Sequence, residues 1–341
     1  MTDYRAVSYW LETCGDDLTP RPPLDGSTDC DVAILGAGYT GLWTAYYLLT
    51  HDPRLRIVIA EAEIAGFGAS GRNGAWCAPG LNISLSRLAR LHGREAARAT
   101  YEATFDAVDE VGRVVMAEAL DVDWARGGQL VVARGRHQAP AIDSTYRELD
   151  RFGLADRYAL LDADRTAQHV QVAGAIRGLY TPDSAVIQPA KLARGLARIV
   201  ERMGARIVEQ TRVTDYRPKD GSGRATLVTA RGEIRAPVVV LAGEAWLTQL
   251  RRLHRQLVPL YSLIVLTEPL SPTQWATIGW ERRECLASTR LSIDYLSRTA
   301  DGRILFGGRG APYRFGSPIR PEYDRHSPTH EMLRAGSYGR T

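Results

Sequence analysis

The stretch CDVAILGAGYTGL, residues 30–42, decides the fold of this 341-residue chain. It begins with a short continuous apolar run, which is typical of a strand buried on both faces in a parallel sheet. Residues 39–50 follow with apolar side chains at helical spacing, and residues 55–60 form a second apolar run. A strand, a helix and a strand within about 30 residues predict a βαβ unit.

Three glycines between the first strand and the helix, Gly36, Gly38 and Gly41, have the spacing G-x-G-x-x-G. The motif occurs often by chance, but here it follows a predicted strand and opens a predicted helix. Glu61 ends the second strand, where its carboxylate can accept hydrogen bonds from a ribose diol. The pattern predicts a dinucleotide site whose phosphates lie at the helix start. The alternative is an ordinary strand-turn-helix whose glycines serve packing alone.

A second glycine-rich stretch, GFGASGRNG at residues 66–74, follows Glu61 closely. Such a loop can lie against an extended ligand with backbone N–H donors and one cation. A flexible surface loop is the alternative. The loop therefore adds a ligand-binding segment to the predicted dinucleotide site.

Charge and composition exclude several classes of function. The net charge of +4 is small and spread along the chain, so we expect no nucleic-acid or membrane partner. The seven histidines and four cysteines have no metal-ligand spacing, so we expect no metal. Few cysteines, no signal-peptide pattern and no long apolar stretch favour a cytoplasmic location.

The rest of the chain mixes helices and strands. Residues 1–28, with Pro20, Pro22 and Pro23, are predicted to be an arm that lies across the first domain or is partly disordered, and regular structure is expected from Cys30. Helices are predicted at 85–120 with a break near Gly93, at 138–151 and at 189–203. Strands are predicted at 127–134, 205–209, 211–217, 225–230, 238–242, 258–268, 288–296 and 303–307. An α/β fold follows, with a nucleotide-binding domain interleaved with a sheet-containing second domain.

The two glycine-rich motifs and Glu61 together resemble FAD-dependent oxidoreductases of the D-amino-acid oxidase (DAO) superfamily. The resemblance is strongest to the branch with gamma-glutamylputrescine oxidase, glycine oxidase and sarcosine oxidase. It continues in SAVIQPAKLARGLA at 184–197, VVVLAGEAW at 238–246, YSLIVLTEPL at 261–270 and RTADGRILFGGRG at 298–310. It implies a Rossmann-like FAD-binding domain at 29–90 and 170–250, an α+β substrate domain at 91–169 and 251–325, and an irregular tail at 326–341.

The resemblance implies FAD as the cofactor and assigns residues to it. The predicted cofactor contacts are Gly36, Gly38, Tyr39, Thr40 and Gly41 at the pyrophosphate, Glu61 at the ribose, Ser70, Arg72, Asn73 and Gly74 beside the ribityl chain and flavin ring, Val213 at the adenine, and Ala242 and Gly243 near the pyrophosphate. Arg72 is also the candidate catalytic residue, because a guanidinium favours the anionic reduced flavin.

The implied reaction oxidises the C–N bond of a small-molecule amine or amino acid to an imine by hydride transfer to flavin N5. O2, giving H2O2, or another acceptor would reoxidise the flavin. The candidate substrate contacts are Tyr261, Arg290, Tyr295, Arg309 and Tyr313, each of which could equally serve packing. An arginine there would suit a carboxylate.

The sequence departs from the family pattern in places. Ala75 and Trp76 stand where the putrescine-oxidising members usually show Gly and Gln, and Glu244 interrupts the second turn. No glycine-rich closing segment is found near the end, so we expect a C-terminally truncated member. The alternatives are a truncated, inactive flavoprotein fragment or an NAD(P)-dependent dehydrogenase that shares only the βαβ unit. The amine, the electron acceptor and the oligomeric state stay open.

Overall fold

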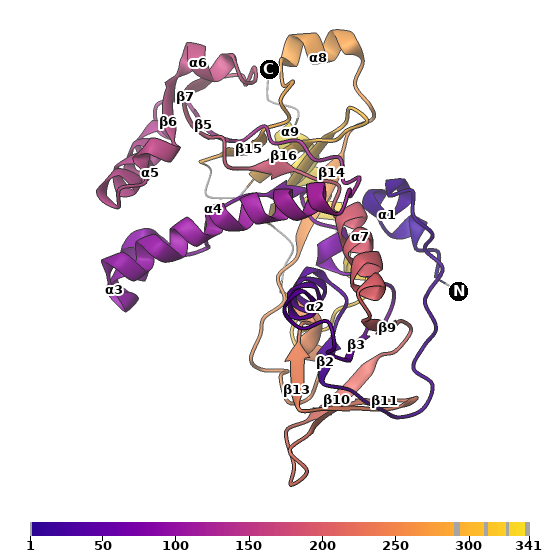
Figure 1. The fold of residues 1–341 in the computed structure, drawn as a ribbon. Coiled ribbons are helices and arrows are strands. Elements are labelled where there is room, and N and C mark those ends of the chain that lie inside the picture. The colour runs from indigo at the N-terminus through magenta and orange to yellow at the C-terminus, as the bar shows by residue number, and fades with distance from the viewer. Residues whose placement is uncertain (1, 290–293, 310–312, 325–326, 338–341) are drawn as a thin grey trace. The chain divides into compact units, whose positions relative to one another are not determined.

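A computed structural model describes residues 2–289, 294–309, 313–324 and 327–337 (Figure 1). These residues divide into two compact units, and each unit is assembled from separated segments. Unit 1 consists of the described residues of Met1–Asn73, Gln188–Leu260 and Tyr313–Pro321, and unit 2 of those of Gly74–Ile187, Tyr261–Pro312 and Glu322–Thr341. The chain therefore passes from one unit to the other several times.

The unit boundaries differ from the predicted domain boundaries. The arm at 1–28 belongs to unit 1, whereas 74–90 and 170–187 belong to unit 2. Strand pairing explains the second difference, because β4 (Trp76–Cys77) pairs with β8 (Ala185–Val186), and β7 (Ala175–Thr181) pairs with β5 (Gln129–Arg134). Local sequence patterns do not reveal such distant partners.

The core of unit 1 is a parallel sheet in the order β13 (Val238–Leu241), β2 (Val32–Leu35), β3 (Ile57–Ala60) and β9 (Arg206–Val208). Helix α2 (Tyr39–His51) connects β2 to β3, which confirms the predicted βαβ unit and the α/β fold class. The continuous apolar run of β13 predicts a strand buried on both faces. It lies at the edge of this sheet instead, and Val238 is 49% exposed.

A second sheet of unit 1 packs on the first. It has the order β1 (Thr28–Asp29), β12 (Gly232–Ala236), β11 (Ala225–Thr229) and β10 (Val213–Arg217), and β10 with β11 is the predicted hairpin. Its Leu227 and Ile234 share one buried cluster with Ala33 and Val58 of the parallel sheet. Because side chains alternate along a strand, Ile34 faces the other side, where α2 lies (Figure 1).

The amino-terminal arm is ordered and packs on unit 1. It contains the 3-10 helix η1 (Arg5–Val7) and helix α1 (Tyr9–Thr13), so regular structure begins before Cys30, contrary to expectation. Trp10 and Leu11 are buried. Arg21 forms ion pairs of 2.6 Å with Glu201 of helix α7 (Pro189–Arg202) and of 2.8 Å with Glu209. The sequence did not predict these contacts. The prolines of residues 1–28 indicated only the absence of long helices or strands.

Unit 2 is built on a sheet of seven strands. Their order is β14 (Ser262–Leu266), β17 (Ile304–Arg309), β16 (Asp294–Arg298), β15 (Cys285–Ser288), β5, β7 and β6 (Ala159–Asp162). Helices α3 (Leu85–His92), α4 (Arg94–Ala117) and α5 (Ala139–Arg151) cover one face, with a shared apolar cluster that includes Leu149 and Leu179. The predicted break between α3 and α4 is confirmed at Gly93, where φ is +88°.

The opposite face of this sheet packs on shorter elements. Helices α6 (Ala163–Ala167) and α8 (Pro272–Ile278) flank an apolar cluster in which Trp275 and Trp280 meet Leu130 and Val132 of β5. The short elements η2 (Ala69–Gly71), η3 (Ala155–Arg157), η4 (Glu244–Gln249) and η5 (Pro321–Asp324) complete the described chain. Among the described residues, no helix combines the length and the apolar character that a membrane span requires.

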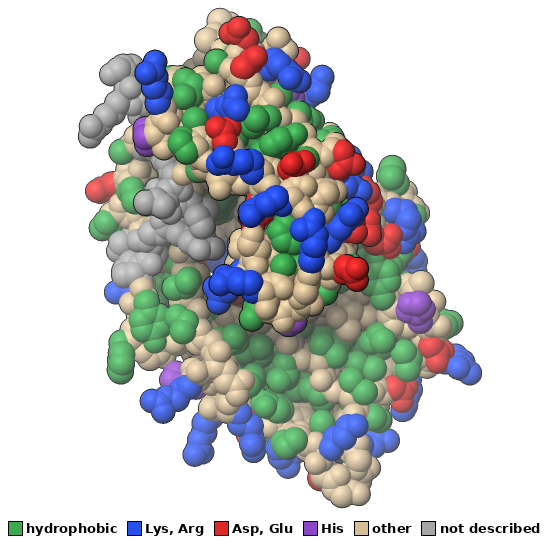
Figure 2. Space-filling model, turned by 90° about the vertical axis from the view of Figure 1, so that its left-hand side faces the viewer, with side chains coloured by type: hydrophobic (Ala, Val, Ile, Leu, Met, Phe, Trp, Pro, Cys, Tyr) green, Lys and Arg blue, Asp and Glu red, His purple; other side chains and the backbone are tan. Residues whose placement is uncertain are grey.

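The prediction of an irregular tail is wrong for the described part of it. Residues Ser327–Ser337 form helix α9, and its Leu333 is buried against Leu263 of β14 and Phe306 of β17. One apolar side chain per turn was too weak a signal to predict this helix from the sequence. On the face shown in Figure 2, arginine and acidic side chains are interspersed, in agreement with the small net charge.

Candidate functional site

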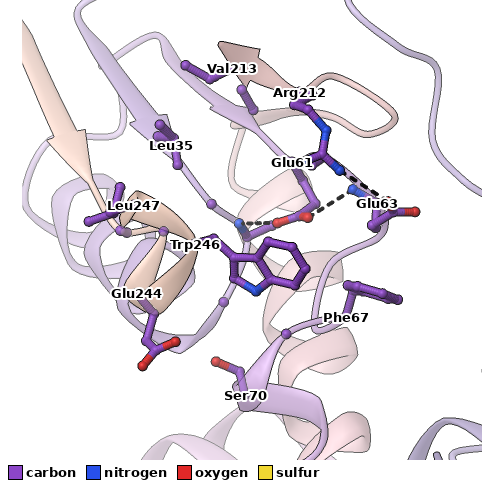
Figure 3. Close-up of a pocket in the computed structure, with 18 of the residues that line it drawn as sticks. Leu35, Glu61, Glu63, Phe67, Ser70, Arg212, Val213, Glu244, Trp246 and Leu247 are labelled. Atoms are coloured by element: carbon purple, nitrogen blue, oxygen red, sulfur yellow. Dashed lines mark hydrogen bonds and ion pairs between the residues drawn. The ribbon is translucent and has the colours of Figure 1, made fainter. Parts of the chain in front are cut away.

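Unit 1 contains a cavity of about 380 Å³ at the carboxyl ends of β2 and β3 (Figure 3). Five segments line it: the loop from β2 into α2, the turn after β3, residues 66–70 of the glycine-rich loop, the start of β10, and the turn after β13 with η4. Ligands of open α/β sheets bind beyond the carboxyl ends of the strands, and ligand cavities commonly measure about 300–1,000 Å³. The predicted dinucleotide motif therefore lies on the wall of a cavity of suitable size.

The glycines of the motif stand where a side chain would not fit. Gly36 has a φ of +102°, and a Cβ on it would lie 2.6 Å from the carbonyl oxygen of Ala242. A Cβ on Gly38 would lie 2.9 Å from Ser70 Oγ, and one on Gly41 would overlap the carbonyl oxygen of Gly36. Bare backbone therefore forms this wall, and its N–H groups can approach a ligand closely.

Glu61 lies on the cavity wall at the end of β3. Its carboxylate accepts hydrogen bonds from the N–H groups of Ala37, at 2.9 Å, and of Glu63, at 3.0 Å (Figure 3). Burial raises the pKa of Glu61 above its usual range, and the two N–H donors partly oppose this. Each carboxylate oxygen can accept more than one hydrogen bond, so a ribose diol could still be bound.

The first turn of α2 meets the loop after β3. Tyr39 N–H donates to Ser70 Oγ at 2.8 Å, and the Tyr39 hydroxyl donates to the Pro189 carbonyl of α7 at 2.9 Å. Thr40 also lines the cavity. The helix N-terminus, which favours a negative charge, therefore faces the cavity with a hydroxyl beside it.

Three more predicted cofactor contacts line the same cavity from later parts of the chain. Val213 is the first residue of β10, and Ala242 and Gly243 follow β13. Ala242 N–H donates to the Leu35 carbonyl at 2.8 Å, which continues the pairing of β13 with β2 beyond the strand ends. Residues separated by some 200 positions in the sequence are thus brought to one site.

The structure does not bring every predicted cofactor contact to this cavity. Gly41 packs α2 onto the sheet, behind the wall, and Gly74 belongs to unit 2. Asn73 donates its side-chain amide to the carbonyls of Ala69 and Ser70. The Arg72 guanidinium lies 4.8 Å from the centre of the Phe67 ring, a side chain that lines the cavity. Arg72 therefore stands one layer away from the cavity.

The predicted substrate contacts that the structure describes do not line this cavity. The Tyr295 ring lies against Gly74 and Gly307, its hydroxyl is 3.0 Å from Ser262 Oγ, and burial raises its pKa. Tyr261 meets the Tyr323 ring edge-on at 6.2 Å. Arg290 and the side chain of Arg309 lie outside the described residues. Tyr313 is in unit 1 and is 47% exposed. These residues are not gathered in one described cavity.

Sequence reasoning missed the aromatic side chain at the middle of the cavity. The Trp246 indole from η4 lies between Glu61 and Ser70, beside Phe67 (Figure 3). Its centre is 6.5 Å from the centre of the Phe67 ring. A dinucleotide that extends from Glu61 to Ser70 would contact this indole or displace it. The residue stood in the quoted motif VVVLAGEAW, but nothing in the pattern indicated its direction.

The amino-terminal arm braces the segments that line the cavity. The Tyr4 hydroxyl donates to Glu63 at 3.0 Å and accepts from the Gln210 amide at 2.7 Å. Burial and the Glu63 carboxylate raise the pKa of Tyr4 to about 12, so the hydroxyl stays protonated as a donor. Leu24 N–H donates to the Thr211 hydroxyl at 2.9 Å. Glu63 and Thr211 both line the cavity.

The residues present fit a dinucleotide cofactor. The bare backbone at Gly36 and Gly38, where a Cβ would collide with Ala242 and Ser70, lies at one cavity with the carboxylate of Glu61 and the N-terminus of α2. These groups match a pyrophosphate and a ribose. The Trp246 indole would have to contact a bound dinucleotide or move aside.

Comparisons with known proteins extend over most of this chain. The model of the DAO family, described as FAD dependent oxidoreductase, matches residues 31–335. Gamma-glutamylputrescine oxidoreductase of Escherichia coli is 28% identical over 310 residues, which are 90% of this chain and 70% of the relative. The probable oxidoreductase OrdL of Haemophilus influenzae is 26% identical over 305 residues, 88% of this chain and 69% of the relative.

Solved structures show the same fold. Glycine oxidase from Geobacillus kaustophilus superposes with a TM-score of 0.63 at 21% identity, over 84% of this chain and 73% of that one. L-proline dehydrogenase from P. horikoshii gives 0.63 at 18% identity, over 92% and 76%. The family match begins after the amino-terminal arm and runs through both units.

Proposed function

This chain belongs to the family of FAD-dependent oxidoreductases, and from that premise we propose that it oxidises the C–N bond of an amine or amino acid. Its cofactor is FAD. Relatives named gamma-glutamylputrescine oxidoreductase and glycine oxidase support an amine or amino-acid substrate. The cavity in which bare glycine backbone stands beside Glu61 carries the proposal, because such a wall serves a dinucleotide.

We assign the cavity wall to the cofactor in order along its length. Gly36, Gly38 and the N-terminus of α2 would hold the pyrophosphate, with Tyr39, Thr40, Ala242 and Gly243 around it. Glu61 would bind the adenosine ribose, and the Val213 backbone would meet the adenine. Ser70, Arg72, Asn73 and Gly74 would run toward the flavin ring. Gly41 supports this wall by holding α2 close to β2.

When bound, FAD would supply the hydride acceptor, and O2, which with two protons would become H2O2, or another acceptor would take up the two electrons. The substrate loses a hydride from carbon and a proton from nitrogen, and becomes an imine. In this proposal the chain orients the cofactor, and Arg72 places a fixed positive charge near the ring, where negative charge develops. Asn73 holds the segment in place through its bonds to Ala69 and Ser70.

The visible absorption spectrum of the purified protein tests the cofactor assignment. We expect a flavin spectrum, either as purified or after incubation with FAD, and release of FAD on heating. A panel of amines and amino acids with peroxide detection, repeated with an artificial electron acceptor, then tests the reaction. A protein that stays colourless with FAD and binds NAD instead would contradict the cofactor assignment, and a bound flavin that no amine reduces would contradict the reaction.

A further inference from the structure

Two cavities of the molecule differ in the charge of their walls. Unit 2 contains a second cavity, of about 460 Å³, on the sheet face that α4 and α5 cover, and none of the described residues that line it is charged. The cavity of unit 1, by contrast, has charged side chains in its wall. Among the described residues these are Glu61, Glu63, Glu244 and Arg212. Three carboxylates and one guanidinium therefore surround a cavity that we assign to FAD, whose pyrophosphate is itself negative.

The charged side chains of this wall differ in their partners. Arg212 lies 3.7 Å from the Glu63 carboxylate, so its positive charge is already paired (Figure 3). Glu61 accepts the N–H groups of Ala37 and Glu63. Within the part of the chain that the structure describes, no hydrogen bond or ion pair engages the Glu244 carboxylate. The negative charge of Glu244 therefore acts on the cavity without a described partner.

Glu244 stands beside the glycine backbone that we assign to the pyrophosphate. It follows Gly243, whose Cα would lie 3.4 Å from a Cβ on Gly36. In Figure 3 the Glu244 carboxylate and the Ser70 hydroxyl both lie below the Trp246 indole. The carboxylate is thus at the pyrophosphate end of the assigned wall.

The backbone at Glu244 favours other residue types. Trp246 N–H donates to the Gly243 carbonyl at 3.0 Å, which closes a four-residue turn with Glu244 in its second position. The φ of Glu244 is +50°, a conformation for which glycine, asparagine and aspartate are preferred in such turns. Its side chain is exposed, so core packing does not require a glutamate either. Strained residues of this kind are concentrated at functional sites.

We propose that Glu244 limits the affinity of this site for FAD, because its carboxylate repels the pyrophosphate. The N-terminus of α2 attracts the same phosphates, so the two effects oppose each other. For partly exposed charges such repulsion changes a dissociation constant by about three- to tenfold, and salt screens it. The proposal rests on the pyrophosphate position assigned under the proposed function, and not on the reaction.

Titration of the flavin-free full chain with FAD, followed by flavin fluorescence, tests this role. Glu244→Gln removes the charge and keeps the size of the side chain and the backbone strain. We expect the dissociation constant of FAD to fall by about three- to tenfold at low salt. Glu12→Gln makes the same change at an exposed position of unit 1 outside the cavity wall and should leave it unchanged.

Salt provides a second readout. Raising the ionic strength from about 0.01 M to about 1 M shortens the Debye length from about 30 Å to about 3 Å. The difference between the wild type and Glu244→Gln should therefore shrink to less than about twofold. A difference that is the same at both salt concentrations, or FAD binding that Glu244→Gln leaves unchanged or weakens, would overturn the proposal.

Two further variants separate charge from backbone strain. Glu244→Gly removes both and should tighten FAD binding by a factor similar to that of Glu244→Gln. Glu244→Lys keeps a long side chain, reverses the charge and should tighten FAD binding more than Glu244→Gln does. Tightening in Glu244→Gly alone would make strain or bulk the cause and would overturn the role of the charge.

Gly38→Ala distinguishes this role of Glu244 from the cofactor assignment. Its Cβ would lie 2.9 Å from Ser70 Oγ, so FAD binding should weaken at least about tenfold. Weaker binding in Gly38→Ala without an effect of Glu244→Gln would overturn the role of Glu244 alone. FAD binding that neither variant changes would overturn the assigned pyrophosphate position and the role of Glu244 together. Effects of both variants, without reduction of the bound flavin by any amine, would overturn the proposed reaction alone.

Discussion

The two cavities are built from different materials. The cavity of unit 1 has bare backbone in its wall, at Gly36 and Gly38, beside the carboxylate of Glu61. The cavity of unit 2 is walled by side chains such as Gln129 and Tyr158. Adding a Cβ to a backbone wall prevents the ligand from binding. Replacing one residue of a side-chain wall can instead change which ligand binds. A family can therefore keep its cofactor while its substrates vary.

The largest expected effect is that of Gly36→Ala. The new Cβ meets the Ala242 carbonyl and strains a φ of +102°, so we expect a loss of about 2–5 kcal/mol in the free energy of unfolding and at least hundredfold weaker FAD binding. Gly204 has a φ of +109° with no atom within 4 Å of a Cβ. Gly204→Ala should therefore show only the backbone strain, about 1–2 kcal/mol.

Urea unfolding and FAD titration of both glycine variants measure these effects. Equal losses in the two variants would mean that backbone conformation, and not the close approach of Ala242, explains the glycine. FAD affinity should be unchanged in Gly204→Ala, since that residue lies outside the cavity wall. The pair therefore tests whether the first cavity is a backbone cradle.

A smaller effect is expected at Glu61, the carboxylate assigned to the ribose. Glu61→Gln should weaken FAD binding about tenfold, because the ribose loses a charged acceptor. In the wild type the folded-state pKa of Glu61 is raised above 4.5, so the folded state holds the proton more tightly than the unfolded state. Stability contributed by this group is present at low pH and is lost as pH rises through the raised pKa.

Unfolding free energies measured across this pH range test the linkage. The fall with rising pH should be reduced in Glu61→Gln and retained in the control Glu281→Gln, an exposed change in unit 2. An unchanged slope in Glu61→Gln would show that burial of this carboxyl is not linked to folding. A Glu61 carboxyl whose protonation is not linked to folding would not be a distinguishing feature of the unit 1 cavity.

The Trp246 indole is a side chain in the wall of the unit 1 cavity, so it offers a further test of the comparison between the two cavities. If it must move before FAD can enter, Trp246→Ala should raise the association rate of FAD, by roughly tenfold if the open arrangement is populated about one tenth of the time. Stopped-flow quenching of flavin fluorescence measures this rate. Trp43→Ala, on the part of α2 outside the cavity wall, should not change it. A slower association in Trp246→Ala would instead make the indole a platform for the cofactor.

The smallest expected effect concerns Ala75, the second residue of unit 2. It is buried and has a φ of +69°, a conformation that favours glycine, and the resemblance implied a glycine there. Ala75→Gly should stabilise the protein by about 0.5–1 kcal/mol, the relief of strain less the added freedom of the unfolded chain. Ala97→Gly near the N-terminal end of α4 should destabilise by about 1 kcal/mol. Thermal unfolding of the two variants should therefore shift in opposite directions.

Local patterns predicted much of unit 1. The apolar runs of β2 and β3, the helical spacing of α2 and the turn residues of the β10–β11 hairpin each depend on neighbours in sequence. They placed Gly36, Gly38 and Glu61 on the wall of one cavity. The direction of the Trp246 indole was not predictable, because it depends on how η4 packs against residues 35 and 67.

Unit 2 was predicted less well because its sheet depends on distant pairing. Strand β5 pairs with β15 on one side and with β7 on the other, so the neighbours of Gln129 come from residues far along the chain. The placement of Gly74 beneath Tyr295 and of Leu333 against β14 has the same origin. Sequence periodicity identifies a strand but not the strands that pair with it. The second cavity is lined by residues from such paired strands.

The arm that braces the first cavity has a consequence for the order of folding. Arg21 and Glu209 are 188 residues apart, and Tyr4 and Gln210 are 206 apart. During synthesis the arm leaves the ribosome well before Glu209 and Gln210, which are made only after about three fifths of the given chain. Contacts of such long sequence separation form late. We therefore expect the residues that are synthesised first to reach their native positions among the last.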